Sequence, residues 1–225
     1  MPGTIVLDIE TLGRWREEDA AAVEEMAAAR EMAAADFVAL SAPLAHVVCV
    51  GMLHVESGVS RALYDASAFP PEAAPLAGDG IEPYGSEAAL LAKVNEVLGK
   101  PGVTRIVTFN GRGFDLPVLI HRSVALGVQV ASKLANAARE YRYRPNLHID
   151  LMDQFTFFGA VRGGSLRSFC VGYGIADPKA DGCGSNVAEL VAAGDVGRLA
   201  DYCLGDVRAT ADLYKRWSDA VGVAA

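Results

Sequence analysis

The first candidates for chemistry in this sequence are two carboxylates near its amino terminus. Asp8 and Glu10 interrupt an aliphatic run, TIVLDIET (4–11), that is typical of a buried strand. Because side chains alternate along a strand, both carboxylates point to the same face. Two like charges side by side are costly to bury, and a divalent cation would offset that cost. The pair alone also fits an ordinary polar strand end, so its meaning depends on partners elsewhere in the chain.

Further polar groups follow at positions that a fold can bring to the same place. A second aliphatic run (104–109) leads into NGRGFD (110–115) and then a predicted helix with Pro117 in its first turn. Asp115 therefore lies at a helix N-terminus, either as a functional carboxylate or as a simple cap. In a predicted late helix, Tyr202 and Asp206 are four residues apart and share one face.

The remaining sequence predicts alternating strands and helices around these groups. Strands are expected at 4–11, 45–55, 59–65, 104–109 and 148–151. Helices are expected at 15–37, 86–98, 115–126, 132–140, 166–173, 186–193 and 196–218. A hairpin turn is expected at 56–58, and the Pro- and Gly-rich segment 69–85 predicts a loop. No repeat or linker divides the chain, so we expect one α/β domain over 1–225 with a mixed sheet.

The composition bounds the class of protein. With 52% hydrophobic and 21% charged residues, the 225-residue chain is predicted to be globular. It has no apolar run long enough for a membrane span and no signal-peptide pattern. The four cysteines, Cys49, Cys170, Cys183 and Cys203, lack CxxC spacing and predict reduced thiols in the cytoplasm. The Gly-rich segment 181–185 lacks the lysine of a P-loop, which excludes that kind of nucleotide site.

The charge is unevenly distributed along the chain. A formal net charge of −8 is unusual for a nucleic-acid-binding protein. Residues 14–36 carry three basic and seven acidic side chains, whereas residues 133–167 carry six basic and three acidic ones. A local basic face beside an acidic metal site can hold a phosphate backbone despite the overall sign. Solvated surface charge is the alternative.

Taken in order, three motifs resemble those of the DEDD-type 3′–5′ exonucleases of the ribonuclease H-like fold. They are DIET (8–11), NGRGFD (110–115) and YCLGD (202–206). Tyr202 lies four residues before the last aspartate, Asp206, and this spacing resembles that of the DEDDy branch. The histidine branch instead has a histidine five residues before that aspartate, where this chain has Asp201. HIDLMDQFTFFG (148–159) and SLRSFCVGYGI (165–175) resemble stand-alone relatives of the family-B DNA polymerase proofreading domain.

The resemblance implies a ribonuclease H-like mixed sheet with flanking helices, and leaves the predicted helix at 15–37 as a helical insertion. It also implies a two-metal phosphodiesterase that uses two Mg²⁺ or Mn²⁺ ions about 4 Å apart. Asp8, Glu10 and Asp206 would hold the ion that carries the attacking water. Asp8 would also contact the second ion, with the help of Asp115, and Tyr202 would orient the water.

The expected activity is removal of nucleoside 5′-monophosphates from the 3′ ends of single-stranded DNA, with DNA repair as one setting. RNA as the substrate is the nearer alternative, and a non-catalytic nucleic-acid-binding protein of the same fold is the other.

We also expect several substrate contacts. Candidates at the terminal nucleotide are Thr11, Leu12, Asn110 and Phe114, with core packing or backbone positioning as alternatives. Candidates along the strand are Arg142, Arg144, Arg162, Arg167, Tyr141 and Tyr143, with solvated charge as the alternative for the arginines. His148 and Asp150 are expected either to support the metal ligands or to form a structural strand end.

Overall fold

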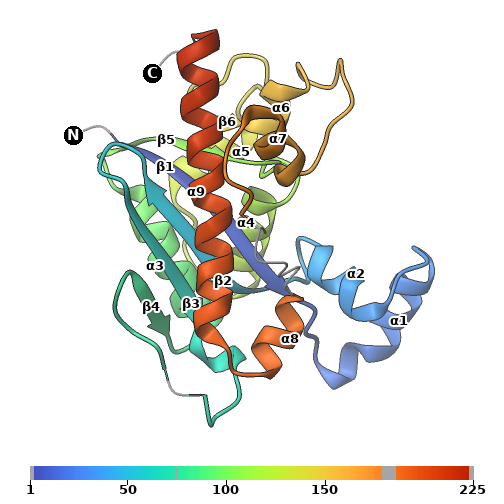
Figure 1. Cartoon of the computed structure of the whole chain (residues 1–225). Helices are drawn as coiled ribbons and strands as arrows, with labels where there is room; N and C mark the ends of the chain where they lie inside the picture. Colours follow the sequence, from blue (N-terminus) through green and yellow to red (C-terminus); the bar gives the residue numbers. More distant parts are fainter. Residues whose placement is uncertain (1–2, 74, 179–185, 223–225) are drawn as a thin grey trace.

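A six-stranded mixed sheet forms the centre of the molecule (Figure 1). The structure is a computed structural model, and it describes residues 3–73, 75–178 and 186–222. The strand order is β4 (Ile81–Tyr84), β3 (Val59–Asp65), β2 (His46–His54), β1 (Gly3–Leu12), β5 (Val103–Thr108) and β6 (His148–Asp150). β1 pairs antiparallel with β2 and parallel with β5, and β6 runs parallel to β5. The carboxyl ends of β1, β5 and β6 therefore lie at the same edge of the sheet, as the predicted α/β fold requires.

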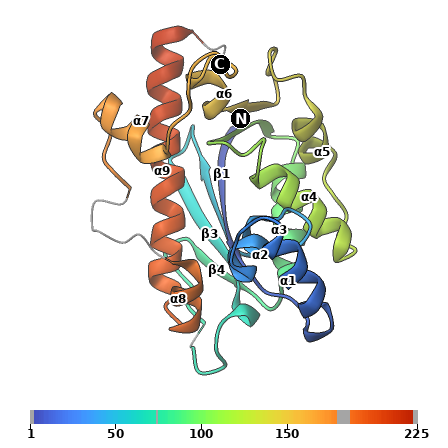
Figure 2. The same ribbon diagram turned by 90° about the vertical axis from the view of Figure 1, so that its right-hand side faces the viewer.

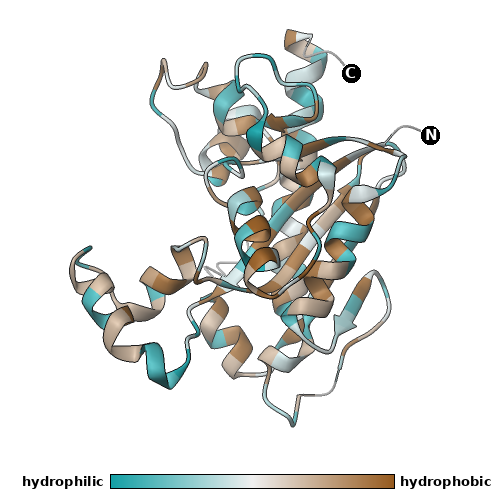
Figure 3. Ribbon diagram, turned by 180° about the vertical axis from the view of Figure 1, so that it is seen from behind, coloured by the Kyte–Doolittle hydropathy of each residue, from teal (hydrophilic) through white to brown (hydrophobic). Residues whose placement is uncertain are grey.

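Helices cover both faces of this sheet (Figure 2). One face carries α3 (Glu87–Gly99), α4 (Asp115–Ala125) and α5 (Ser132–Arg139). The other carries α9 (Val196–Val221) with α7 (Leu166–Tyr173) and α8 (Val187–Ala192), while the short α6 (Leu151–Phe155) follows β6. Hydrophobic residues are concentrated on the strands and on the helix surfaces toward them (Figure 3). Along β1, Leu7 and Ile9 pack toward α3–α5, whereas Val6 packs toward α9.

Local signals in the sequence account for most of these elements. Ser86 caps α3, because its side chain accepts a hydrogen bond from the Ala89 backbone N–H. The predicted hairpin is confirmed, and Gly58 in its turn has φ +70°. The predicted loop 69–85 is wrong at its end, where β4 adds to the sheet edge beside β3. Pro83 is tolerated there because an edge strand needs fewer backbone donors.

The predicted single helix at 15–37 is also wrong. The segment forms a 3-10 turn (Glu17–Asp19), α1 (Ala20–Ala28) and α2 (Ala34–Leu40), and the chain reverses at Glu31, whose φ is +54°. Alanine-rich sequence favours helix along the whole segment, so the break comes from tertiary packing. Buried Val23 and Val38 lie on α1 and α2, which contact each other, and α2 also contacts β1 (Figure 1). None of the described helices combines the length and apolarity needed to cross a membrane.

Candidate active site

Asp8 and Glu10 lie on the face of β1 that is covered by α9. Their neighbours across the strand pair on β2 are Gly51 and Cys49. A Cβ atom at Gly51 would lie 2.9 Å from the Sγ of Cys203 and 3.1 Å from its carbonyl oxygen. Glycine opposite Asp8 therefore allows α9 to approach the sheet closely at the position of the carboxylates.

Cys203 on α9 completes a cluster of possible metal ligands that the sequence analysis did not identify. A carboxylate oxygen of Asp8, one of Glu10 and the Sγ of Cys203 all lie within 4.8 Å of one another. A hydrogen bond with Cys49, burial, and the negative charges of Glu10 and Asp8 raise the pKa of the Cys203 thiol well above its ordinary value. Cys203 lies within YCLGD, three residues before Asp206, but neither this spacing nor its residue type indicates that it lies beside the acidic pair.

The two predicted residues of α9 lie close to this cluster along the helix. Asp206 is one turn beyond Cys203 and is buried, so it is on the side of α9 that packs against the rest of the protein. Tyr202 precedes Cys203 and is partly exposed. Because α9 covers the face of β1 that carries Asp8 and Glu10, the buried Asp206 lies on the same side of the sheet as this pair. The catalytic roles of these two residues remain predictions.

Asp115 approaches β1 from the start of α4. Its carboxylate is buried and accepts a hydrogen bond from the backbone N–H of Ile9, which lies between Asp8 and Glu10. Burial, together with the nearby charge of Asp150, raises the pKa of Asp115 to about 7. The helix-capping position itself is occupied by Phe114, whose side chain makes no capping hydrogen bond. Asp115 thus contacts the strand that carries the acidic pair.

Asp150 and His148 position the loop that precedes Asp115. The Asp150 carboxylate accepts hydrogen bonds from the backbone N–H groups of Asn110 at 2.8 Å and Arg112 at 2.9 Å. It holds Asn110 in a left-handed conformation with φ +65°. His148 is fully buried, and its Nε2 lies 2.8 Å from the Thr108 hydroxyl. Of the two alternatives for this pair, these contacts favour the structural one.

A pocket of about 500 Å³ lies beside Glu10. Its lining includes three of the four residues predicted at the terminal nucleotide, namely Thr11, Leu12 and Phe114, together with residues of α2 and α8. Asn110 is not among the described lining residues. The Thr11 hydroxyl donates a hydrogen bond to the Ala39 carbonyl at 2.8 Å, so this residue also holds α2 in place.

The arginines predicted to contact phosphates differ in their surroundings. Arg142 forms an ion pair with Asp153, and Arg167 forms one with Asp177. The side chains of Arg144 and Arg162 make no hydrogen bond or ion pair with any residue that the structure describes. The last two are therefore the more available phosphate contacts.

Two exposed aromatic rings lie beside these arginines. Tyr141 and Tyr143 are 65% and 54% exposed, and their ring centroids are 5.4 Å apart. The Tyr143 ring is also 4.9 Å from that of Phe158, and the guanidinium of Arg142 lies over it. Exposed aromatic rings with neighbouring arginines form a surface on which unpaired bases can stack.

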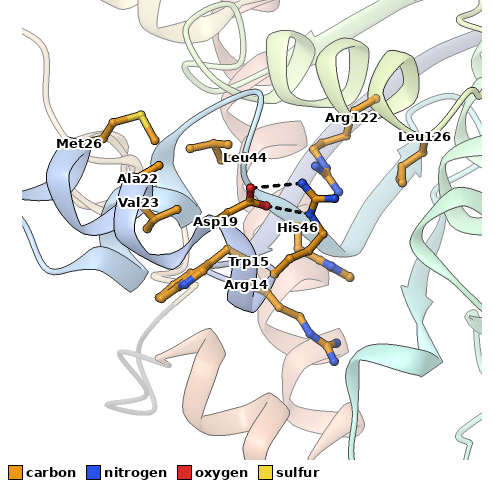
Figure 4. Close-up of a pocket in the computed structure, with 12 residues that line it drawn as sticks. Arg14, Trp15, Asp19, Ala22, Val23, Met26, Leu44, His46, Arg122 and Leu126 are labelled. Atoms are coloured by element: carbon orange, nitrogen blue, oxygen red, sulfur yellow. Dashed lines mark hydrogen bonds and ion pairs between the residues drawn. The ribbon is translucent and has the colours of Figure 1, made fainter.

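A separate cavity of about 730 Å³ lies between α1 and α4 (Figure 4). It is lined by three arginines and one histidine, and by none of the five predicted catalytic residues. Arg16 is paired with Asp19 at 2.8 Å and Arg122 with Glu87 at 2.6 Å. Because most of its charge is balanced within the protein, we assign no chemistry to this cavity.

The six-stranded mixed sheet with helices on both faces defines a ribonuclease H-like α/β domain. Residues 75–223 match a family described as a predicted 3′–5′ exonuclease related to the exonuclease domain of PolB, and the chain belongs to this family. DNA polymerase 1 of Aeropyrum pernix is 33% identical over 148 residues, which cover 60% of this chain and 14% of the polymerase.

The fold is also similar to a solved structure. The family B DNA polymerase of Pyrobaculum calidifontis matches with a TM-score of 0.59 and 16% identity, over 96% of this chain and 24% of the polymerase. This likeness shows the fold, and it confirms the predicted ribonuclease H-like architecture. The chain spans only a small part of either polymerase.

Proposed function

We propose that this protein is a metal-dependent 3′–5′ exonuclease that acts on single-stranded DNA and releases nucleoside 5′-monophosphates. The observation that supports it most is the meeting of Asp8 and Glu10 with α9 at a group of possible metal ligands. Family membership supports nuclease activity, and the similarity to a DNA polymerase favours DNA over RNA. A scaffold protein would have no use for several buried carboxylates in one place, which argues against a non-catalytic role.

The donor chemistry of the site fits hard divalent ions. Asp8, Glu10, Asp115 and Asp206 supply carboxylate oxygens, which suit Mg²⁺ or Mn²⁺ better than softer metals. We propose that these four residues hold two such ions, with Asp8 contacting both. Ions bound there would offset the negative charge of the phosphodiester and lower the pKa of water.

The remaining residues of the site would position the reactants. An unperturbed phenol is a poor base at neutral pH, so we assign Tyr202 the orientation of the attacking water by a hydrogen bond. The pocket beside Glu10 would receive the terminal nucleoside, with Leu12 and Phe114 against the base. Asp150 would fix the loop from Asn110 to Asp115 in the conformation that this arrangement needs.

The single strand would continue over the exposed aromatic surface formed by Tyr141 and Tyr143, with the Phe158 ring beside Tyr143. This surface is joined to the active-site loop through Asp153, which pairs with both Arg112 and Arg142. We propose Arg144 as a phosphate contact within it.

We also propose that the chain acts as one domain with a helical insertion, and that it works in the cytoplasm. The cysteines that the structure describes, Cys49, Cys170 and Cys203, are buried free thiols, as expected for a reducing compartment. Trimming of 3′ ends during DNA repair is a setting that suits such an activity.

The catalytic assignment predicts that D8N and D206N lose activity by roughly three powers of ten or more, because removal of one ligand dismantles a two-metal site. The assay uses 5′- and 3′-labelled single-stranded and duplex DNA and RNA, with and without Mn²⁺. D201N is the matched control, because Asp201 is exposed on the same helix beside Tyr202, and it should keep wild-type activity. Cleavage by D8N at the wild-type rate would refute the assignment.

The aromatic surface predicts a separate binding defect. Replacing both Tyr141 and Tyr143 by alanine should weaken the binding of single-stranded DNA by about tenfold or more, since stacking contributes roughly 1–3 kcal/mol per base. Fluorescence anisotropy measures this change, and because both rings are exposed the fold should be retained. W15A removes another exposed aromatic ring, from the acidic insertion, and should bind normally. Equal affinities for the double variant and the wild type would exclude this surface as a binding site for single-stranded DNA.

A further inference from the structure

Arg112 fastens the active-site loop (residues 110–114) to two neighbouring helices. Its Nε donates a hydrogen bond to the carboxylate of Asp153 in α6 at 3.0 Å. Its Nη1 donates to the backbone carbonyl of Glu140, at the end of α5, also at 3.0 Å. The side chains of Arg112 and Asp153 are only 18% and 11% exposed. A planar guanidinium held by two acceptors has one orientation, so this side chain fixes the loop that leads into Asp115.

The same contacts hold the segment that carries the two exposed tyrosines. This segment, residues 141–146, is named the tyrosine loop. The Glu140 carboxylate closes it, because it accepts hydrogen bonds from the backbone N–H groups of the two residues that follow the loop, at 2.9 Å and 2.8 Å. Within the loop, Arg142 pairs with one carboxylate oxygen of Asp153, and Arg112 pairs with the other. The tyrosine loop and the active-site loop are therefore joined by one carboxylate.

This junction depends on a single acidic side chain. Among the residues that the structure describes, Asp153 is the only carboxylate that pairs with either Arg112 or Arg142. An asparagine in its place would have one acceptor oxygen where aspartate has two, so it could hold only one of the two guanidinium groups. A displacement of the tyrosine loop would therefore reach the active-site loop through Asp153.

We propose that Asp153 is a positioning residue: a strand long enough to lie on Tyr141 and Tyr143 is hydrolysed faster at its 3′ end, because Asp153 then holds Arg112 and the active-site loop in place. Asp153 itself does not touch the strand. The inference rests on the proposed exonuclease function. Binding energy from parts of a substrate remote from the reacting bond raises the rate when it holds catalytic groups in position.

Hydrolysis of single-stranded oligonucleotides of increasing length, from a dinucleotide upward, tests the proposal with Mn²⁺ and saturating substrate. In the wild type, kcat should rise by about tenfold once the strand reaches the tyrosine loop. In D153N, kcat for long strands should fall to about the value for short ones. R139Q removes a neighbouring exposed arginine of α5 that makes no contact with Asp153, and should behave as the wild type.

A double-mutant cycle distinguishes positioning from a general loss of structure. The Y141A/Y143A variant should also lose the rise in kcat with length. Combining it with D153N should lower kcat no further, whereas independent defects would multiply. Thermal unfolding checks the fold of D153N. R142Q, at a partly exposed position, breaks only the Arg142 contact and decides the matter if D153N does not fold, by a fall in kcat for long strands alone.

The outcomes separate this inference from the proposed function. A wild type that degrades none of these strands would refute both. If the wild type degrades them with a kcat that does not depend on length, only the inference about Asp153 is overturned. The same holds if the effects of D153N and Y141A/Y143A multiply, or if R142Q keeps the wild-type dependence on length.

Discussion

At the scale of single residues, the acidic pair on β1 was predictable and its thiol neighbour was not. Asp8 and Glu10 were recognisable because carboxylates are rare within a buried strand. Cys203 is a small apolar residue in most cores, so its type alone carries no signal. Its closeness to the pair follows from the register that puts Gly51 opposite Asp8, which only the folded sheet reveals.

The buried His148 should make stability depend on pH. Burial, and then the positive charge of Arg112, lower the pKa of His148 to about 3, whereas histidine in an unfolded chain titrates near 6.5. Between these values the unfolded chain binds a proton that the folded chain does not. The free energy of unfolding should therefore fall as the pH drops below about 6.5, by up to about 1.4 kcal/mol per pH unit from this residue.

The variant H148Q tests this expectation. Its amide can still hydrogen-bond to Thr108 but does not titrate, so unfolding in urea should show a smaller pH slope between about pH 6 and pH 4.5. H121Q, at an exposed histidine of α4, serves as the control and should keep the wild-type slope. Equal slopes for H148Q and the wild type would contradict the assigned role of this histidine.

At the scale of elements, helix and strand identities were largely predictable, and the bend in the insertion was not. The capping of α3 by Ser86 and the turn at Gly58 depend only on residues close together in the sequence, so local patterns predict them. The separation of α1 from α2 depends on Thr11 and Gly13, which are distant in sequence from α2. No local pattern encodes such a contact, so propensity alone predicts one long helix.

Because α9 lies close to β2, a single methyl group added at Gly51 should lower both stability and activity. In G51A the new Cβ would collide with the Cys203 side chain and its carbonyl oxygen, and α9 would have to move away. We expect a loss of about 1–3 kcal/mol in the free energy of unfolding. Activity should fall as well, because Asp206 would shift relative to Asp8. G172A in α7 adds a methyl group where nothing lies within 4 Å and should have neither effect. A fully active G51A protein would show that the spacing of α9 is not critical.

At the scale of the whole molecule, bound divalent ions should stabilise the fold. Ligands that bind only the folded state raise the free energy of unfolding, by about 2.7 kcal/mol at a hundred times the dissociation constant. Mg²⁺ or Mn²⁺ should therefore raise the Tm by several degrees, measured by calorimetry at constant ionic strength. D8N should lose most of this shift and D201N should keep it. An unchanged Tm for the wild type would count against the metal site.

The position of β1 in the middle of the sheet has a consequence for any attempt to shorten the protein. The segment recognisable as the exonuclease family, residues 75–223, begins after β1, β2 and β3. An excised fragment of that length would keep Asp115 and Asp206. It would lack Asp8, Glu10 and the backbone of Ile9 in β1, which Asp115 contacts. We therefore expect a fragment of residues 75–223 to be inactive, because the proposed metal site needs Asp8 and Glu10.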